Sequence, residues 1–141
     1  MLLEHLVPFL ENTSPKINGD GETSRDFTFF ENAVQANIRT LQFGVNNLKT
    51  SGTEEFSADE LRCHEVFNTA CGDQVTLNEM IQILQKVSGK NLQLVYGPVR
   101  TGDVKHSKAS IYKISKTLGY MPKFRFKEGL DIALKWYNSQ Q

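Results

Sequence analysis

The feature that most limits how this chain can fold is the shortness of its strand-like segments, which alternate with longer segments of helical periodicity. The strand pattern of β-branched, aromatic or alternating apolar residues occurs in Lys16–Asn18, Arg25–Phe30, His64–Asn68 and Asn91–Tyr96. At 141 residues the chain has the length of a single domain, and we predict a mixed α/β lobe. Three or four short strands would leave open sheet edges, which is a first indication of a missing partner.

The helical periodicity predicts about five helices. The clearest starts at Thr76, whose hydroxyl can accept from the Glu79 amide while the Glu79 carboxylate accepts from the Thr76 amide, and Gly89 ends it. Trp136 and Tyr137 lie at helical spacing and are expected in the core. The other helices are a short apolar one over residues 1–10 that Pro8 interrupts, Glu31–Phe43 before Gly44, Ala109–Leu118 before Gly119, and Lys127–Tyr137.

The charge balance and the cysteines exclude several classes of protein. Lys and Arg number 16 and so do Asp and Glu, so the basic excess typical of nonspecific nucleic-acid binding is absent. No stretch approaches the roughly 20 apolar residues of a membrane-spanning helix, and the opening residues lack the basic start of a signal peptide. Cys63 and Cys71 are too few for a disulfide framework, and with His64 they lack the paired C-x₂-C spacing of a metal site. We expect a cytoplasmic protein with reduced thiols and without metal, nucleic-acid or membrane partners.

Five short motifs follow one another in a specific order. They are Ile17–Phe27 with a helix start at Glu31, Val66–Asn68 with Gly72 and the Thr76 helix start, Arg100–Ser107, Lys116–Pro122, and Glu128–Leu130 with Trp136 and Tyr137. In these motifs the chain resembles the carboxyl-terminal, substrate-binding lobe of the NAD-dependent epimerase/dehydratase family, the extended short-chain dehydrogenases/reductases. The sequence of Arg100–Ser107 is most similar to that of the UDP-N-acetylglucosamine 4-epimerases of bacterial surface-polysaccharide pathways. These enzymes are isomerases close to the UDP-glucose 4-epimerases.

The resemblance implies a fold and a division of the chain. It implies the C-terminal part of a protein whose NAD(P)-binding Rossmann lobe is missing here. Residues 1–14 would be a helix and lead-in left from the preceding lobe, and residues 15–141 the sugar-nucleotide-binding domain. Within that domain, residues 45–60 are polar and rich in turn formers, which predicts a flexible loop. The surface left by the missing lobe is expected to favour self-association.

The resemblance also implies a set of UDP-binding residues. Arg25 and Arg100 would bind the pyrophosphate, because planar guanidinium groups form paired, charge-assisted hydrogen bonds with such oxygens. Asp103 would accept hydrogen bonds from the ribose hydroxyls. Taken alone, Arg25 followed by Asp26 is more typical of a surface ion pair, and Arg100 with Asp103 of a turn that has its own salt bridge.

Three further residues complete that set. Asn68 is similar to a residue that contacts the nucleotide from the end of its strand, although an asparagine before a loop also caps backbone groups. The backbone at Ile17 and Asn18 would contact the uracil edge. Gly19 and Gly21 would allow the close approach of that backbone.

The resemblance places the catalytic machinery outside this chain. In the family, NAD takes a hydride from C4 of the sugar while a Tyr-x-x-x-Lys pair handles the hydroxyl proton, and the Gly-rich NAD loop and that pair lie upstream of the region matched here. Gly19-Asp-Gly21 is followed by Ser24 in place of a third glycine, and Tyr112 and Lys116 fall in a structural helix beyond Asp103. We expect no catalytic residue and no NAD site in this chain, which should not epimerise a sugar by itself.

Two other functions remain open from the sequence. The same lobe belongs to dTDP- or GDP-sugar dehydratases and to sugar-nucleotide reductases, which differ mainly in residues of the absent lobe. A non-catalytic interaction module that kept the fold and lost its nucleotide ligand is the second. A preference for UDP over dTDP and GDP would favour the epimerase.

Overall fold

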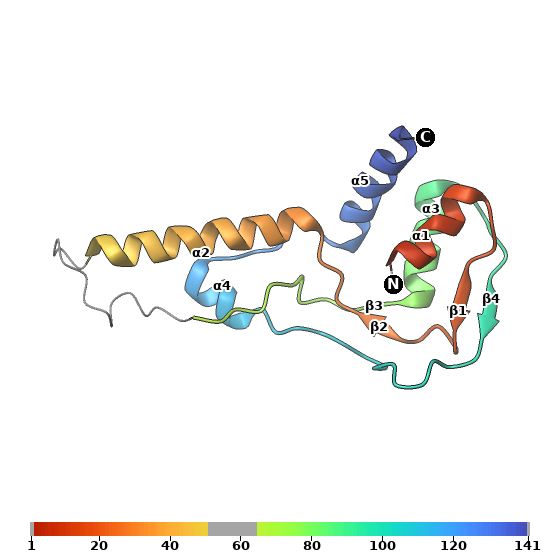
Figure 1. Ribbon diagram of the computed structural model, residues 1–141, viewed down its shortest axis with the longest axis horizontal. Coiled ribbons are helices and arrows are strands. Elements are labelled where there is room, and N and C mark those ends of the chain that lie inside the picture. Colours follow the sequence, from red (N-terminus) through yellow and green to blue (C-terminus); the bar gives the residue numbers. More distant parts are fainter. Residues whose placement is uncertain (1, 51–64, 141) are drawn as a thin grey trace.

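Five helices and four short strands follow one another along the residues that the computed structural model describes, 2–50 and 65–140 (Figure 1). In chain order they are α1 (Leu2–Glu11), β1 (Lys16–Asn18), β2 (Ser24–Arg25), α2 (Phe30–Thr50), β3 (Val75–Thr76), α3 (Leu77–Ser88), β4 (Val95–Gly97), α4 (Tyr112–Leu118) and α5 (Phe126–Ser139). All five predicted helices are present. The ends of α3 agree with the prediction, and each of the other four differs from its prediction at one end or both. Within these two ranges, no helix is long and apolar enough to cross a membrane.

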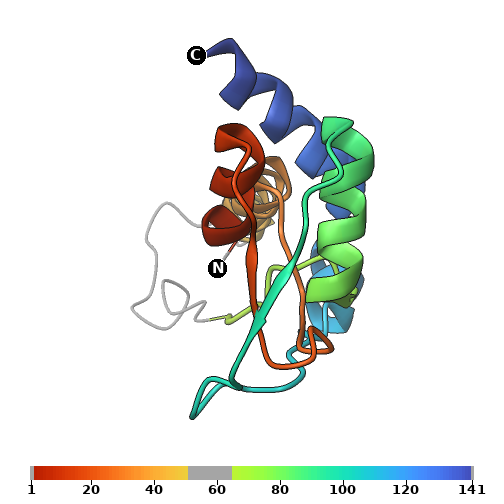
Figure 2. The same cartoon turned by 90° about the vertical axis from the view of Figure 1, so that its right-hand side faces the viewer.

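In the described residues the strands form two separate pairs. β1 and β4 run parallel, with Asn18 opposite Gly97, and Figure 2 shows them side by side. β2 and β3 run antiparallel, with Ser24 opposite Thr76. Because parallel strands end at the same edge, the first pair brings the turn after β1 next to the segment that follows β4.

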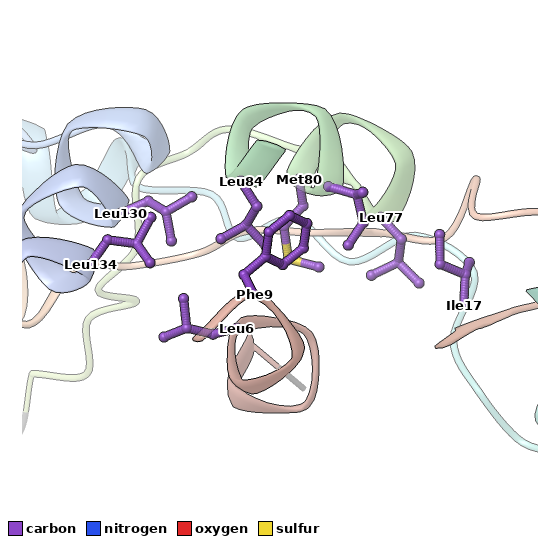
Figure 3. Packing of buried hydrophobic residues seen from close by; sticks show 9 residues of the cluster. Leu6, Phe9, Ile17, Leu77, Met80, Leu84, Leu130 and Leu134 are labelled. Atoms are coloured by element: carbon purple, nitrogen blue, oxygen red, sulfur yellow. The ribbon is translucent and has the colours of Figure 1, made fainter. Parts of the chain in front are cut away.

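The main core lies where α1, α3 and α5 meet (Figure 3). α3 is amphipathic, and its two ends are defined by a capping box and by a left-handed Gly89. The Glu79 amide donates to Thr76 Oγ1 at 3.1 Å and the Thr76 amide donates to Glu79 Oε2 at 2.8 Å, which confirms the predicted capping box. The buried residues of this core are Leu6, Phe9, Ile17, Leu77, Met80, Ile81, Leu84, Leu130 and Leu134.

A second, smaller core joins α2 to α4. Its buried residues are Ala36, Ile114, Leu118 and Tyr120. The Tyr120 hydroxyl, which lies in this apolar environment, donates to the carbonyl of Ala70 at 2.9 Å, so the buried phenol is satisfied. Figure 1 shows the second half of α2 extending away from α1, α3 and α5.

A buried asparagine connects the start of α2 to the segment that leads into α5. The side chain of Asn32 is inaccessible to solvent, and its Nδ2 donates to the Phe124 carbonyl at 2.7 Å. Its Oδ1 accepts from the amides of Lys123 and Phe124 at 2.9 and 3.1 Å. These three bonds satisfy backbone groups that would otherwise be buried without partners, and they fix the approach to α5.

α2 runs further than its sequence predicts. α2 continues through Gly44 to Thr50, so the prediction that it ends at Phe43 is wrong, as is the predicted loop over residues 45–50. A single glycine lowers helix stability by only about 1 kcal/mol, and Gly44 is not among the glycines with positive φ, so it does not act as a C-cap. Residues 51–60 of the predicted loop lie outside the described residues.

Pro8 does not interrupt the first helix, which continues to Glu11, and that prediction is also wrong. Proline removes one backbone hydrogen bond from a helix interior and costs about 3 kcal/mol. α1 tolerates this because Leu6 and Phe9, on either side of Pro8, are both buried in the main core (Figure 3). Tertiary packing therefore outweighs the local preference.

The predicted strands are mostly longer than the observed ones. The strand predicted over Arg25–Phe30 is wrong beyond Arg25, and the one predicted over His64–Asn68 does not form in its described residues, 65–68. The first departs from strand because the Asp26 carboxylate accepts from the Cys71 and Gly72 amides, both at 3.0 Å, in place of a ladder. The second has no regular secondary structure, and within the described residues no backbone–backbone hydrogen bond reaches it. The observed β4 covers only the end of the predicted Asn91–Tyr96 strand.

Trp136 was expected in the core, and this expectation is wrong because its side chain is 57% exposed. α5 turns Leu130 and Leu134 toward the main core, and Tyr137 packs against that core partly buried. Trp136 lies on the opposite side of the helix and touches Tyr137 edge-on, with ring centroids 5.0 Å apart. Helical spacing alone did not show which of these two aromatic residues faces inward.

The α3 cap yields a stability prediction. Replacement Thr76→Ala removes the hydroxyl that accepts from Glu79, and we expect a loss of about 1 kcal/mol in the free energy of unfolding. The measurement is urea denaturation followed by circular dichroism. Thr117→Ala, at an exposed threonine inside α4, is the matched control and should change stability by less than about 0.5 kcal/mol. Equal effects of the two substitutions would contradict the role of the cap.

Candidate functional site

The segment from Pro98 to His106, called here the 98–106 loop, is held at both of its ends. At its start, β4 pairs with β1, and the Gly19 amide donates to the Gly97 carbonyl at 3.0 Å. At its end, the Ser24 amide donates to the Lys105 carbonyl at 2.9 Å, and a parallel bridge joins Ser24 to His106. The loop therefore spans from the β1 edge to β2 (Figure 1).

The end of the loop brings Arg25 and Asp103 together. The guanidinium Nη2 of Arg25 forms an ion pair with Asp103 Oδ1, although the two residues are 78 positions apart. Nη1 donates to the carbonyl of Ser24 at 2.8 Å and of Lys105 at 3.4 Å. The Arg25 side chain is only 16% exposed, so the pair is partly shielded from water. Arg25 thus pairs with Asp103 rather than with Asp26, its neighbour in the sequence.

The start of the loop contributes Arg100 to a cavity of about 560 Å³ between α1, β1 and the first residues of the 98–106 loop. Asn18 on β1 also lines this cavity, and Lys16 adds a second cation two residues earlier on the same strand. The residues that line the cavity are Glu4, His5, Pro8, Ser14, Lys16, Asn18, Pro98, Val99 and Arg100. The sequence analysis missed Lys16, although strand alternation places Lys16 and Asn18 on one face, with Ile17 on the other.

His5 gives this cavity a buried polar atom. Burial lowers the pKa of His5, and the nearby Glu4 opposes that shift only in part, which favours the neutral imidazole. Its Nδ1 has no hydrogen-bond partner among the described residues. Sequence reasoning missed His5, and no signal in the sequence marks it, because its burial depends on the packing of α1 against the rest of the chain.

The six predicted UDP-binding residues occupy three places. Arg100 and Asn18 line the cavity, and Arg25 pairs with Asp103 further along the loop. The side chain of Ile17 is buried in the main core, which leaves its backbone, paired in register with Tyr96, as the part near the cavity. Asn68 lies apart from both groups and donates to the Ser110 carbonyl at 3.4 Å.

The Gly19-Asp-Gly21 turn does not fit a dinucleotide. It leads into β2 and not into a helix, so it lacks the amide-rich helix start that binds a pyrophosphate. Both glycines have positive φ, but a side chain at Gly21 would meet Asn78 Oδ1 at 2.1 Å. Asn78 also donates through Nδ2 to the Asp20 carbonyl at 3.0 Å. The space beside the turn is thus filled by α3.

Other candidate chemical groups are remote from the cavity. Tyr112 and Lys116 both lie on α4, where the ammonium is 5.8 Å from the ring centroid, and neither lines the cavity. Burial raises the pKa of the Cys71 thiol, and the charge of Asp26 adds to that shift, so the thiol stays protonated. Cys63 and His64 lie outside the described residues, and within the described ones no three His, Cys, Asp or Glu side chains cluster as metal ligands.

Known proteins resemble this chain over part of their own length. A UDP-glucuronate 4-epimerase of Thermodesulfobacterium geofontis is 30% identical over 122 residues, which are 86% of this chain and 32% of the relative. The crystal structure of UDP-glucose 4-epimerase with UDP-glucose from Thermotoga maritima is 27% identical and superposes with a TM-score of 0.78, covering 99% of this chain and 39% of that one.

A UDP-glucuronic acid 4-epimerase from Bacillus cereus, solved with UDP-glucuronic acid and NAD, shares the fold with a TM-score of 0.79 at 24% identity, over 99% of this chain and 40% of that one. The chain therefore spans about a third to two fifths of the length of these relatives. The family described as GDP-mannose 4,6 dehydratase matches residues 6–133. With nine tenths of its residues inside that match, the chain belongs to this epimerase/dehydratase family of sugar-nucleotide proteins and represents a partial length of it.

Proposed function

We propose that this chain binds the nucleoside diphosphate part of a UDP-sugar, as the substrate lobe of a UDP-N-acetylglucosamine or UDP-glucose 4-epimerase. The observation that carries the proposal is the 98–106 loop, held at one end by β1 and at the other by β2. This anchoring gives the loop two functional groups in defined positions, Arg100 at the cavity and Asp103 beside Arg25. A preorganised loop reduces the ordering entropy that ligand binding would otherwise require.

The charges of the cavity suit a diphosphate. Such a group carries about two negative charges, and Arg100 and Lys16 supply two cations to the lining of the cavity, where Glu4 is the one acidic residue. Among the described residues, Arg100 forms no ion pair that would compete with a ligand.

The pair of Arg25 and Asp103 suits the sugar of the nucleotide. Asp103 Oδ1 is held by Arg25, and the carboxylate has further acceptor capacity for a ribose hydroxyl. In the proposal Arg25 orients Asp103 and adds positive charge toward the pyrophosphate. The backbone at Ile17 and Asn18, at the edge of β1, would contact the base. Asn68 is the least supported member of the set, because it already bonds the Ser110 carbonyl away from the cavity.

The described residues support binding and not chemistry. They contain no Gly-rich dinucleotide loop, and the Tyr112 and Lys116 pair lies outside the cavity. NAD and the hydride transfer therefore belong, in this proposal, to a part of the longer relatives that this chain does not cover.

The first prediction concerns Arg100. Replacement Arg100→Ala should weaken UDP binding by about 2 kcal/mol, roughly thirtyfold, because one charge-assisted contact with the diphosphate is lost. Isothermal titration of the folded protein with UDP measures this, and Lys127→Ala, an exposed cation at the start of α5, is the control that should bind as the unmodified chain does. A folded chain without UDP affinity, or indifference to Arg100→Ala, would favour the interaction module without a nucleotide ligand.

The second prediction concerns the base. The chain should bind UDP more tightly than GDP or dTDP in parallel titrations, because the proposed backbone contacts at the edge of β1 would discriminate the base. GDP is the informative competitor, since the matching family is described as GDP-mannose 4,6 dehydratase. Tighter binding of GDP or dTDP would transfer the proposal to a dehydratase or a reductase of the same family.

A further inference from the structure

The buried hydroxyl of Ser24 joins the 98–106 loop to two other segments of the chain. Ser24 lies on β2 and is only 4% exposed. Its Oγ lies 2.8 Å from Nδ1 of His106, the last residue of the loop, and 3.2 Å from Nε2 of Gln74, which immediately precedes β3. Among the described residues, no other group forms a hydrogen bond with this hydroxyl. These two contacts therefore have to satisfy it between them.

The directions of the two hydrogen bonds follow from the donors and acceptors present. The Gln74 amide nitrogen can only donate, so it occupies one lone pair of the Ser24 oxygen. The Ser24 proton then needs an acceptor, and within the described residues that acceptor is Nδ1 of His106. An imidazole nitrogen accepts only when it carries no proton, which places the proton of the neutral ring on Nε2. An imidazolium donates from both nitrogens and would leave the buried hydroxyl without an acceptor.

The backbone around the same contact fixes the end of the loop. The Ser24 amide donates to the Lys105 carbonyl at 2.9 Å, and the Ser107 amide donates to the Ser24 carbonyl at 3.1 Å. These two bonds lie on either side of His106 in the chain, and they form the bridge between the loop and β2. The side-chain contact and the two backbone bonds therefore hold the same point of the loop.

Charged residues lie on each segment that meets at this point. Arg25, the next residue of β2, is paired with Asp103 on the loop. Lys105 also belongs to the loop, and Asp73 lies before β3, where its carboxylate accepts from the following backbone amide. Among the described residues, none of these four groups forms a hydrogen bond with the ring of His106, which is exposed to solvent. The imidazole is thus the titratable group that contacts the buried hydroxyl.

We propose that His106 is a positioning residue of the nucleotide site, which holds the 98–106 loop by accepting the hydrogen bond of Ser24 and releases the loop when the imidazole is protonated. Asp103 would then keep its place beside Arg25 best at a pH at which the ring is neutral. The role of His106 in holding the loop is independent of any ligand, whereas its effect on UDP affinity rests on the proposed function.

Two substitutions separate the acceptor from the rest of the side chain. His106→Asn keeps an oxygen acceptor near the place of Nδ1 and cannot titrate, whereas His106→Ala removes the acceptor. Hydrogen exchange at the Ser24 and Ser107 amides reports whether the loop stays joined to β2. At about pH 8, His106→Ala should lower the protection of both amides about tenfold, and His106→Asn should retain it within about twofold. Lys108→Ala, at an exposed cation just beyond the loop, is the matched control and should leave both amides unchanged.

The pH profile is a readout that a purely structural side chain would not change. From about pH 8 to about pH 5, the range in which histidines usually protonate, the protection factors of the unmodified chain should fall, while those of His106→Asn stay level. Nitrogen NMR of the ring at about pH 8 should show the proton on Nε2. In isothermal titration at about pH 8, UDP should bind about fivefold more weakly to His106→Ala and nearly normally to His106→Asn.

Three results would overturn the inference. One is a ring proton on Nδ1 at about pH 8, the arrangement in which the Gln74 side chain is turned over and accepts from Ser24. Another is an equal loss of amide protection in His106→Ala and His106→Asn. The third is the same pH dependence of protection in His106→Asn as in the unmodified chain. The expected protection and tautomer without any UDP affinity would contradict only the proposed function.

Discussion

Ser24 is the point at which three distant segments of the chain meet. Its backbone pairs with Thr76 in β3 and exchanges hydrogen bonds with the Lys105 carbonyl and the Ser107 amide. Its buried hydroxyl lies 2.8 Å from His106 Nδ1 and accepts from Gln74 at 3.2 Å. The position of the 98–106 loop depends on these contacts, because nothing within the loop besides one turn from Arg100 to Asp103 would define its path.

Polar side chains join other distant segments of the fold in the same way. Asp26 holds the turn at Cys71 and Gly72 through its carboxylate, and Arg125 donates to the Cys71 carbonyl at 2.9 Å. Asn32 holds the approach to α5. These bonds satisfy backbone groups in segments without regular structure. The long connecting segments are therefore held in place although the strands of the described residues are short. They also explain why the chain leaves the strand geometry after Arg25.

The chain spans only part of the length of its relatives, and its helix α2 exposes several apolar side chains. The chain brings together cations, a carboxylate and a strand edge, which in the proposed function bind the nucleotide, while the described residues provide no dinucleotide loop. Val34, Ile38 and Leu41 of α2 are exposed apolar residues, and the nearby residues 65–68 contact α4 through Lys113, whose ammonium donates to the Val66 carbonyl at 3.0 Å. The proposed nucleotide site around β1 lies at the other end of the molecule (Figure 1).

The sequence alone determined the features that depend on neighbours within one helical turn or one strand. The capping box at Thr76 and Glu79 and the helix ends at Gly89 and Gly119 were predictable because their partners lie three or four residues away. The ordered motifs also predicted the family. They were sufficient to nominate Arg25, Arg100 and Asp103, but not their arrangement.

Only the tertiary structure decided which of these residues meet. Arg25 pairs with Asp103 instead of Asp26, and Arg100 shares a cavity with Lys16 and His5, because β1 with β4 and β2 with the 98–106 loop join segments about eighty residues apart. Likewise, strand propensity at residues 65–68 produced no strand, since a ladder needs a second chain segment and composition cannot supply one. Local pattern sets what a segment prefers, whereas long-range hydrogen bonding and burial decide what it contacts.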